Sequence, residues 1–411
     1  MIVGELPADA ESARPPANST ASVLGAALVS GLAGYAALIL AARTLSPAAN
    51  AEFLVFWGVV FAMYGVLIGV TTETTRVVST SHELSTATIR LMQVVLGFAM
   101  TLVAVVALTG VLWAPQVFGS RWPALLVATV VGTTLFSVHA AVAGVASGRG
   151  AWSGYSLLVA GETVTRLVLF AVVAGVAAST VGFALSSAIA SGFWLLATMF
   201  SRRYRTLWSQ RVGGTRRGLV RRLVAACSAA GVSALLLVGY PVLLRITTPD
   251  DVFVGAAPIL LAVSLCRAPL LIPLGAYQNV VVTRVATHGV RALVPVLVGL
   301  GGLTVIGSLA AWPIGPWALR VVNPEYHVAG PVFAGRVLGA GRVAVLTVTG
   351  AAAVALDHYT VYLAGWIAAT VATVAALLVP GDLEARVIAS LLVGPAVGVA
   401  VHLVWGRQRI G

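Results

Sequence analysis

The sequence has 411 residues, of which 59% are apolar and only 9% charged, and its mean hydropathy is +0.99. Soluble domains usually contain about 25% charged residues, so this composition excludes a soluble globular protein and indicates a polytopic membrane protein. The net charge of +12 comes from 25 arginines, with no lysine, against 13 acidic residues. Such a charge is also typical of nucleic-acid-binding proteins, but its position between apolar segments argues against a nucleic-acid partner.

Twelve apolar stretches follow a polar tail at residues 1–20. The tail carries Glu5, Asp9 and Glu11 before any apolar run, which is unlike a signal peptide. Each later stretch is long enough to cross a bilayer as a helix, and turn-forming residues such as Ser46-Pro47 mark the breaks. We expect helices at 22–42, 51–72, 91–113, 123–146, 155–177, 180–200, 223–246, 252–277, 292–312, 331–354, 359–379 and 386–405.

An arginine-rich segment at residues 201–222 divides these helices into six and six. It holds Arg202, Arg203, Arg205, Arg211, Arg216, Arg217, Arg221 and Arg222. A cytoplasmic linker held at an anionic leaflet explains this run better than a nucleic-acid site. The predicted organisation is therefore a cytoplasmic tail (1–20), a six-helix lobe (21–200), the linker (201–222), a second six-helix lobe (223–406) and a cytoplasmic C-terminus (407–411).

The distribution of arginine predicts the orientation in the membrane. If the N-terminus is cytoplasmic, the inner segments hold 16 arginines and the outer loops hold 5, namely Arg43, Arg121, Arg245, Arg320 and Arg386. Positive residues concentrate on the cytoplasmic side of membrane proteins. The count therefore favours a multi-pass protein of a bacterial cytoplasmic membrane with both termini inside.

The two halves contain a weak internal repeat. Arg43 and Pro47 close the first apolar segment, and Arg245 and Pro249 follow the seventh with the same spacing, at an offset of 202 residues for both pairs. A cation near a helix C-terminus followed by proline is also ordinary helix-end chemistry. Because each half would begin and end on the same side of the membrane, the predicted fold is two bundles related by a parallel repeat, a sign of a transporter.

Four ionisable residues fall within or near the ends of the predicted spans and form two close pairs in sequence. Glu73 and Arg76 are three residues apart, and Glu162 and Arg166 are four apart, so each pair shares one face of a helix. Charges inside a membrane are costly and usually line a cavity or pair with each other. We consider all four as substrate-binding candidates. The alternatives are a snorkelling interface anchor for the first pair and a structural ion pair for the second.

Arg267 is the strongest single candidate for a binding residue. It lies about 22 Å deep in the eighth predicted span, no acid occurs within 15 residues on either side, and Pro269 and Pro273 follow it. Prolines weaken a helix and are tolerated where it lines a cavity. The alternative is that Arg267 pairs with Glu162 or Glu73 from another helix. Arg336 falls either in an outer loop or at the start of the tenth helix.

The sequence lacks the motifs that several classes of function require. The chain has no Walker A, HExxH or CxxC motif, and Cys227 and Cys266 both fall in predicted spans. We therefore expect neither a metal nor a cofactor. Apart from 201–222, no loop is long enough to form a catalytic domain, so an enzyme is not expected.

Two short motifs resemble those of polysaccharide flippases of the multidrug/oligosaccharidyl-lipid/polysaccharide (MOP) superfamily. The turn with Arg43, Leu45 and Pro47 is similar to the A-R-x-L-x-P turn of that family, and Glu73, Thr75 and Arg76 are similar to its E-x-T-R motif. The resemblance implies a MATE-like, V-shaped pair of six-helix bundles. It also implies that a polyprenyl-diphosphate-linked oligosaccharide moves from the inner to the outer leaflet.

Three functions stay open at this point. The first is a flippase for a lipid-linked anionic oligosaccharide, with the lipid bilayer and the enzymes of polysaccharide assembly as further partners. The second is a cation-coupled multidrug or metabolite exporter of the same fold, in which Glu162 would serve as the cation site. The third is a membrane enzyme or scaffold of polysaccharide assembly. The surplus of arginine over acid inside the spans favours the anionic cargo.

Overall fold

The computed structural model describes residues 17–81, 89–356 and 358–407, and within α12 several side chains lie outside the description. The predicted cytoplasmic tail is thus outside the described residues up to position 16, as is the C-terminus from 408. Helices of the first half are α1 (Ala17–Thr44), α2 (Pro47–Thr80), α3 (Leu91–Phe118), η3 (Gly119–Arg121), α4 (Trp122–Gly148), α5 (Trp152–Val176), α6 (Thr180–Ala190) and α7 (Phe193–Phe200).

The second half is likewise nearly all helical. A short connection precedes it, made of α8 (Arg202–Arg205), η4 (Thr206–Ser209) and the strand β2 (Arg211–Val212). The helices that follow are α9 (Arg216–Leu237), α10 (Tyr240–Ile246), α11 (Asp250–Phe253), α12 (Ala257–His288), η5 (Val290–Leu293), α13 (Val294–Val322), α14 (Gly330–Ala355), α15 (Tyr359–Leu378) and α16 (Leu383–Arg407).

The predicted fold class is confirmed: the chain is an all-α, multi-pass membrane protein. Ten stretches of the described residues are long and apolar enough to cross a membrane, and one of them, Leu91–Gly148, contains both α3 and α4. The 32-residue α12 adds a further long helix in the position of the eighth predicted span. The arrangement is consistent with two bundles of six.

Two of the predicted spans are broken helices. The sixth span bends at Ser191-Gly192, between α6 and α7, and the seventh bends at Val238-Gly239, between α9 and α10. Pro241, at the start of α10, favours a new helix start there, because proline lacks an N–H and is tolerated in the first turn. Each break frees backbone groups in the interior of the protein, where they can bind side chains.

The helix ends depart from the predictions at three places. α2 continues to Thr80, so Glu73 and Arg76 are inside the helix. α9 begins at Arg216, where the predicted linker was still expected to continue, because Thr215 accepts a hydrogen bond from the Gly218 N–H at 3.1 Å and caps the helix. The eighth span, predicted from residue 252, begins only at Ala257 with α12, and the residues before it form the separate short helix α11.

One feature is not helical. The strand β1 (Ile89–Arg90) pairs antiparallel with β2, with Ile89 opposite Val212 and Arg90 opposite Arg211. The ribbon joins the segment before α3 to the arginine-rich connection. Val212 is fully buried, and Arg90 and Arg211 are exposed. The connection is therefore anchored to the first half through its backbone.

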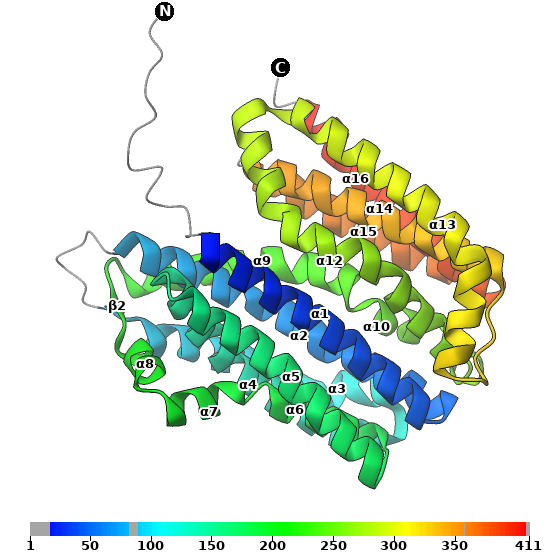
Figure 1. The fold of residues 1–411 in the computed structure, drawn as a ribbon, viewed down its shortest axis with the longest axis horizontal. Coiled ribbons are helices and arrows are strands. Elements are labelled where there is room, and N and C mark those ends of the chain that lie inside the picture. The colour runs from blue at the N-terminus through cyan, green and yellow to red at the C-terminus, as the bar shows by residue number, and fades with distance from the viewer. Residues whose placement is uncertain (1–16, 82–88, 357, 408–411) are drawn as a thin grey trace, which may run out of the picture.

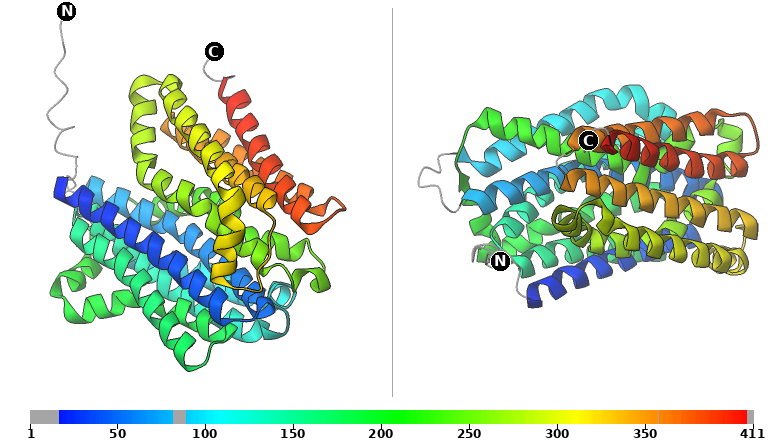
Figure 2. Two further views of the ribbon diagram at one scale, coloured as in Figure 1. Left: turned by 45° about the vertical axis from the view of Figure 1, so that its right-hand side comes forward. Right: turned by 90° about the horizontal axis from the view of Figure 1, so that it is seen from above.

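The two halves form a V-shaped molecule (Figures 1 and 2). The first turn of α1 and the last turn of α16 lie toward the same end of the molecule, where the lobes diverge (Figure 2). At the opposite end, the last turn of α1 and the first turn of α2 contact the segment between α13 and α14. Asn323 Nδ2 donates to the Ala42 carbonyl at 2.8 Å, and Asn50 Nδ2 donates to the Tyr326 hydroxyl at 2.8 Å. The two lobes thus meet at the end away from the termini.

A close helix contact joins the lobes along one side. α9, the first helix of the second half, packs along α2 of the first half. Gly65 and Gly69 permit this approach, because a Cβ on Gly65 would lie 2.3 Å from Ala234 Cβ and one on Gly69 would lie 2.5 Å from the Cys227 nitrogen. Small residues are the usual means by which membrane helices approach closely. The seam between α2 and α9 is therefore a tightly packed interlobe contact.

Candidate functional site

A cavity of about 410 Å³ lies between the two lobes. It is bounded by α1 and α2 from the first lobe and by the α9–α10 break, α12 and α14 from the second. The lining of the cavity is mostly apolar. Among the described residues that form it, Arg267 carries the charge. The lining residues include Ser30, Tyr35, Trp57, Tyr240, Ser264 and Thr347.

Arg267 is held on the cavity wall by the broken seventh span. Its side chain is buried, with 5% of its surface exposed. Nη1 donates to the carbonyls of Leu236 at 3.2 Å and Leu237 at 2.8 Å, which are the last two residues of α9. Carbonyls at a helix C-terminus lack partners within the helix and carry partial negative charge. The end of α9 thus compensates part of the positive charge of the guanidinium. The central carbon of the guanidinium also lies 5.2 Å from the centre of the Tyr240 ring.

The rest of this guanidinium makes no hydrogen bond to the described residues. Nε and Nη2 of Arg267 are both buried and have no partner among them. The two acids considered as partners in sequence bind other arginines instead, as described next. An unsatisfied buried charge is costly unless a ligand or water supplies the missing contacts. Two donor atoms of Arg267 thus lack an acceptor among the described residues, and both are enclosed by the protein in this state.

Glu162 and Arg166 form a buried ion pair inside the first lobe. They lie on α5 with 6% and 2% of their surface exposed, and Arg166 Nη2 donates to Glu162 Oε1. Ser191, at the α6–α7 break, donates to the same Glu162 oxygen at 3.2 Å. The Arg166 guanidinium also stands 4.8 Å from the centre of the Phe61 ring. The two charges thus pair with each other on one helix, although Arg166 Nε has no hydrogen-bond partner among the described residues. Neither residue is among those that line the interlobe cavity.

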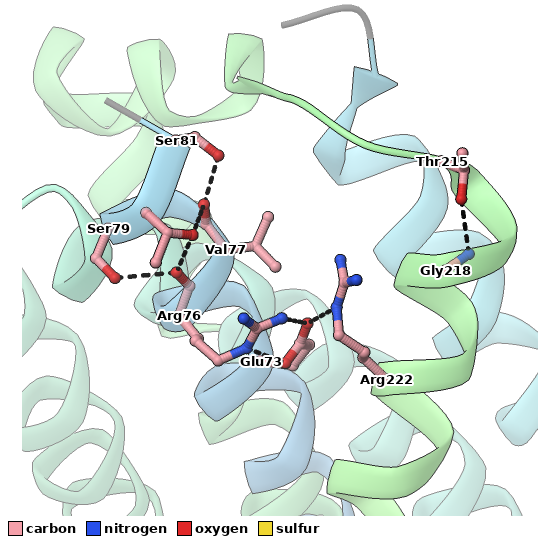
Figure 3. A network of polar contacts seen from close by, with 9 residues as sticks. Glu73, Arg76, Val77, Ser79, Ser81, Thr215, Gly218 and Arg222 are labelled. Atoms are coloured by element: carbon pink, nitrogen blue, oxygen red, sulfur yellow. Dashed lines mark hydrogen bonds and ion pairs between the residues drawn. The ribbon is translucent and has the colours of Figure 1, made fainter. Parts of the chain in front are cut away.

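Glu73 lies at the centre of an ion network that joins the lobes (Figure 3). Its Oε1 accepts from Arg76 Nη2 at 2.6 Å and from Arg222 Nε at 2.7 Å, and its Oε2 accepts from Arg76 Nε at 2.8 Å. Arg76 is on α2, whereas Arg222 is on α9, 149 residues away from Glu73. The network closes the end of the tightly packed α2–α9 seam.

Arg336 is a second buried arginine of the second lobe. It lies within α14, which decides between the two placements that the sequence left open, and 1% of its surface is exposed. Glu384 lies 3.7 Å from it, and none of its three side-chain nitrogens makes a hydrogen bond to the described residues. The sequence does not distinguish Arg336 from Arg342, which lies on the same helix and is exposed.

The five predicted site residues therefore occupy three separate places. Arg267 lines the cavity, Glu162 and Arg166 are buried in the first lobe, and Glu73 and Arg76 are at the α2–α9 seam. Sequence reasoning missed Arg222, because its contact with Glu73 depends on packing between lobes. It also missed the Leu236 and Leu237 carbonyls, which lack partners within the helix because α9 ends at Leu237, before the Val238-Gly239 break.

Related sequences place this chain in a protein family. It is 35% identical over 398 residues to the uncharacterized protein Rv3630 of Mycobacterium tuberculosis (strain ATCC 25618 / H37Rv), covering 94% of this chain and 91% of that protein. It is 36% identical over 400 residues to the uncharacterized protein Rv1510 of the same strain, covering 95% and 92%. The chain belongs to this family. No protein-family model matches the sequence.

Solved structures show that this chain has the fold of MATE transporters, which are named as members of the MOP superfamily. An inward-facing multidrug resistance MATE transporter matches with a TM-score of 0.68 at 15% identity, over 95% of this chain and 98% of that one. The eukaryotic MATE transporter AtDTX14 matches with a TM-score of 0.64 at 10% identity, over 95% of both chains.

A third structure of this fold comes from Pyrococcus furiosus and matches with a TM-score of 0.64 at 15% identity, over 97% of this chain and 96% of that one. It is a MOP-superfamily transporter for which a reversed polarity of the binding pocket has been taken to suggest a different function. The fold neighbours are thus transporters, and at these identities the likeness concerns the fold alone.

Proposed function

We propose that this protein is an alternating-access transporter that moves an anionic, lipid-linked oligosaccharide from the inner to the outer leaflet of a bacterial cytoplasmic membrane. The observation that supports this most is Arg267, a buried arginine on the wall of the interlobe cavity with Nε and Nη2 unpaired. A cavity whose described lining has one arginine and no carboxylate favours an anionic cargo.

The chemistry of a polyprenyl diphosphate suits this cavity. A guanidinium stays charged when it is desolvated, and its planar fork binds two phosphate oxygens at once. The mostly apolar lining suits the first carbons of a lipid tail. The turn with Arg43 and the sequence around Glu73, which resemble polysaccharide flippases, point in the same direction.

The membrane potential would assist this direction of transport. Each elementary charge that crosses it contributes about 2.3 kcal/mol per 100 mV. A diphosphate of about −2 charge leaving a negative interior would therefore gain roughly twice that if it crossed the whole field. Arg267, whose side chain stays in the cavity, would bind the diphosphate while the two lobes exchange access.

The second candidate is a multidrug exporter, because several proteins of this fold carry that name. A cationic drug requires a carboxylate in the cavity, or a coupled cation site elsewhere. Glu162 is the buried acid of the first lobe, but its two oxygens accept from Arg166, Ser191 and Thr163. The anionic cargo therefore stays the better supported of the two.

The test is flipping in proteoliposomes with a fluorescent polyprenyl-diphosphate disaccharide. A membrane-impermeant quencher reports the fraction of the lipid in the exposed leaflet as a function of time. We expect the wild-type protein to accelerate this exchange and Arg267→Ala to abolish the acceleration. The matched control is Arg320→Ala. Arg320 is an exposed arginine of the second lobe, and among the described residues its side chain donates a hydrogen bond only to the Pro316 carbonyl of its own helix, at 3.3 Å.

A fluorescent organic cation serves as the competing cargo in the same vesicles. Transport of the cation without movement of the diphosphate lipid would contradict the proposal and favour the exporter. Chemical conversion of the lipid would favour an enzyme of polysaccharide assembly.

A further inference from the structure

The two arginines of the internal repeat make equivalent contacts across the interlobe boundary. Arg43 is the next-to-last residue of α1, and its Nη2 donates to the Val321 carbonyl, on the next-to-last residue of α13, at 2.9 Å. Arg245 is the next-to-last residue of α10, and its Nε donates to the Val117 carbonyl, on the next-to-last residue of α3, at 3.4 Å. In each case the arginine of one lobe binds the third long helix of the other.

These contacts have a common physical basis. The last carbonyls of a helix have no partner within the helix, and its C-terminus attracts cations. Arg43 and Arg245 therefore cap a helix of the opposite lobe as well as contributing to the end of their own. The pattern explains why both copies of the repeat keep an arginine at this position.

All of these residues lie at the end where the lobes meet. Asn323 and Asn50 add two buried hydrogen bonds beside Arg43. Arg245 is further held by Asp250 of its own lobe, at 2.5 Å, and lies 5.0 Å from the centre of the Phe253 ring. A movement that opened this end would separate each guanidinium from its carbonyl.

We infer that Arg43 and Arg245 form a pair of latches that keep the lobes together at this end and must release for the cavity to open there. The inference rests on the alternating access of the proposed function, but not on the cargo. Releasing one latch leaves the other in place, so the removal of both arginines should shift the equilibrium more than either alone.

The experiment measures the distance between the lobes at this end by electron spin resonance on the full-length protein in lipid nanodiscs. Spin labels are placed at Ala178→Cys and Val379→Cys, in the exposed turns after α5 and α15. The background carries Cys227→Ala and Cys266→Ala, and its melting temperature is first compared with that of the wild type.

We expect Arg43→Ala and Arg245→Ala each to raise the ratio of long to short distances roughly threefold, and the double variant roughly tenfold, as for the loss of partly exposed charged hydrogen bonds. The control Arg320→Ala lies at the same end and should leave the ratio unchanged. If the alanine pair does not fold, the pair Arg43→Gln and Arg245→Gln repeats the test with side chains that preserve more of the volume.

Two results would overturn the latches in distinguishable ways. If the parent protein shows two distances and the folded double variant does not change their ratio, the latches are wrong while alternating access stands. If every variant shows a single unchanged distance, the latches and alternating access both fail.

Discussion

In the first lobe, the buried Arg166 lies against Glu162 of its own helix, whereas in the second lobe the equally buried Arg267 and Arg336 make no hydrogen bond to a carboxylate among the described residues. Arg267 relies on the end of α9, and Arg336 lies 3.7 Å from the partly exposed Glu384. Glu162 compensates the charge of Arg166 on the same helix, whereas the two arginines of the second lobe have no acid on their own helices. We therefore propose a structural role for the first pair and a binding role for Arg267.

The largest effect is expected from breaking the pair in the first lobe. Arg166→Ala leaves Glu162 buried without its counter-charge. The loss of one partner of a buried ion pair lowers the free energy of unfolding by about 3–5 kcal/mol. Thermal unfolding in detergent should show a large fall in melting temperature. The double variant Glu162→Gln with Arg166→Met should recover most of it, and failure to recover would mean that Arg166 has a role beyond the pair.

A change of melting temperature in the opposite direction, or none, is expected for Arg336 of the second lobe, whose only acid among the described residues is the partly exposed Glu384 at 3.7 Å. Arg336→Met replaces a buried charge that makes no hydrogen bond with an apolar side chain of similar length. Burying a charge without hydrogen bonds is costly, and the Glu384 left behind is partly exposed to solvent, so we expect the variant to be neutral or more stable by about 1 kcal/mol. The measurement is again the melting temperature. A large fall in melting temperature would show that Arg336 is strongly paired with Glu384. The second lobe would then hold a structural ion pair as the first lobe does.

A small effect is expected at the α2–α9 seam. Arg222→Ala removes one of the two arginines on Glu73, but the Arg222 side chain is 42% exposed and Arg76 stays in place. Partly exposed ion pairs contribute about 1 kcal/mol or less, so the melting temperature should fall only slightly. The neighbouring exposed Arg221→Ala is the matched control, and an equal fall in both variants would mean that the Glu73 contact contributes nothing.

Much of the fold could be predicted from the sequence because membrane helices follow local composition. The twelve apolar stretches and the i,i+4 spacing of Glu162 and Arg166 need no tertiary information. The repeat offset placed Arg43 and Arg245 at equivalent helix ends, as the structure has them. Whether the two halves superpose as whole bundles stays a prediction, and so do the sidedness of the termini and the cytoplasmic position of the linker.

The site was harder to predict because its partners come from distant segments. The carbonyls that hold Arg267 are about 30 residues away and are exposed only because α9 ends at Leu237. Arg222 meets Glu73 only because small residues let α9 pack against α2. Apolar periodicity carries no information on such contacts between segments far apart in sequence.

The central claim is that Arg267 binds the anionic head group of the cargo instead of stabilising the fold. The most direct test measures lipid flipping and melting temperature on the same preparations of wild type, Arg267→Ala and Arg267→Lys. We predict lost flipping in the alanine variant and partial flipping in the lysine variant, which keeps the charge without the planar fork. Both should melt near the wild-type temperature. Normal flipping by Arg267→Ala, or a loss of stability that accounts for the lost flipping, would contradict the claim.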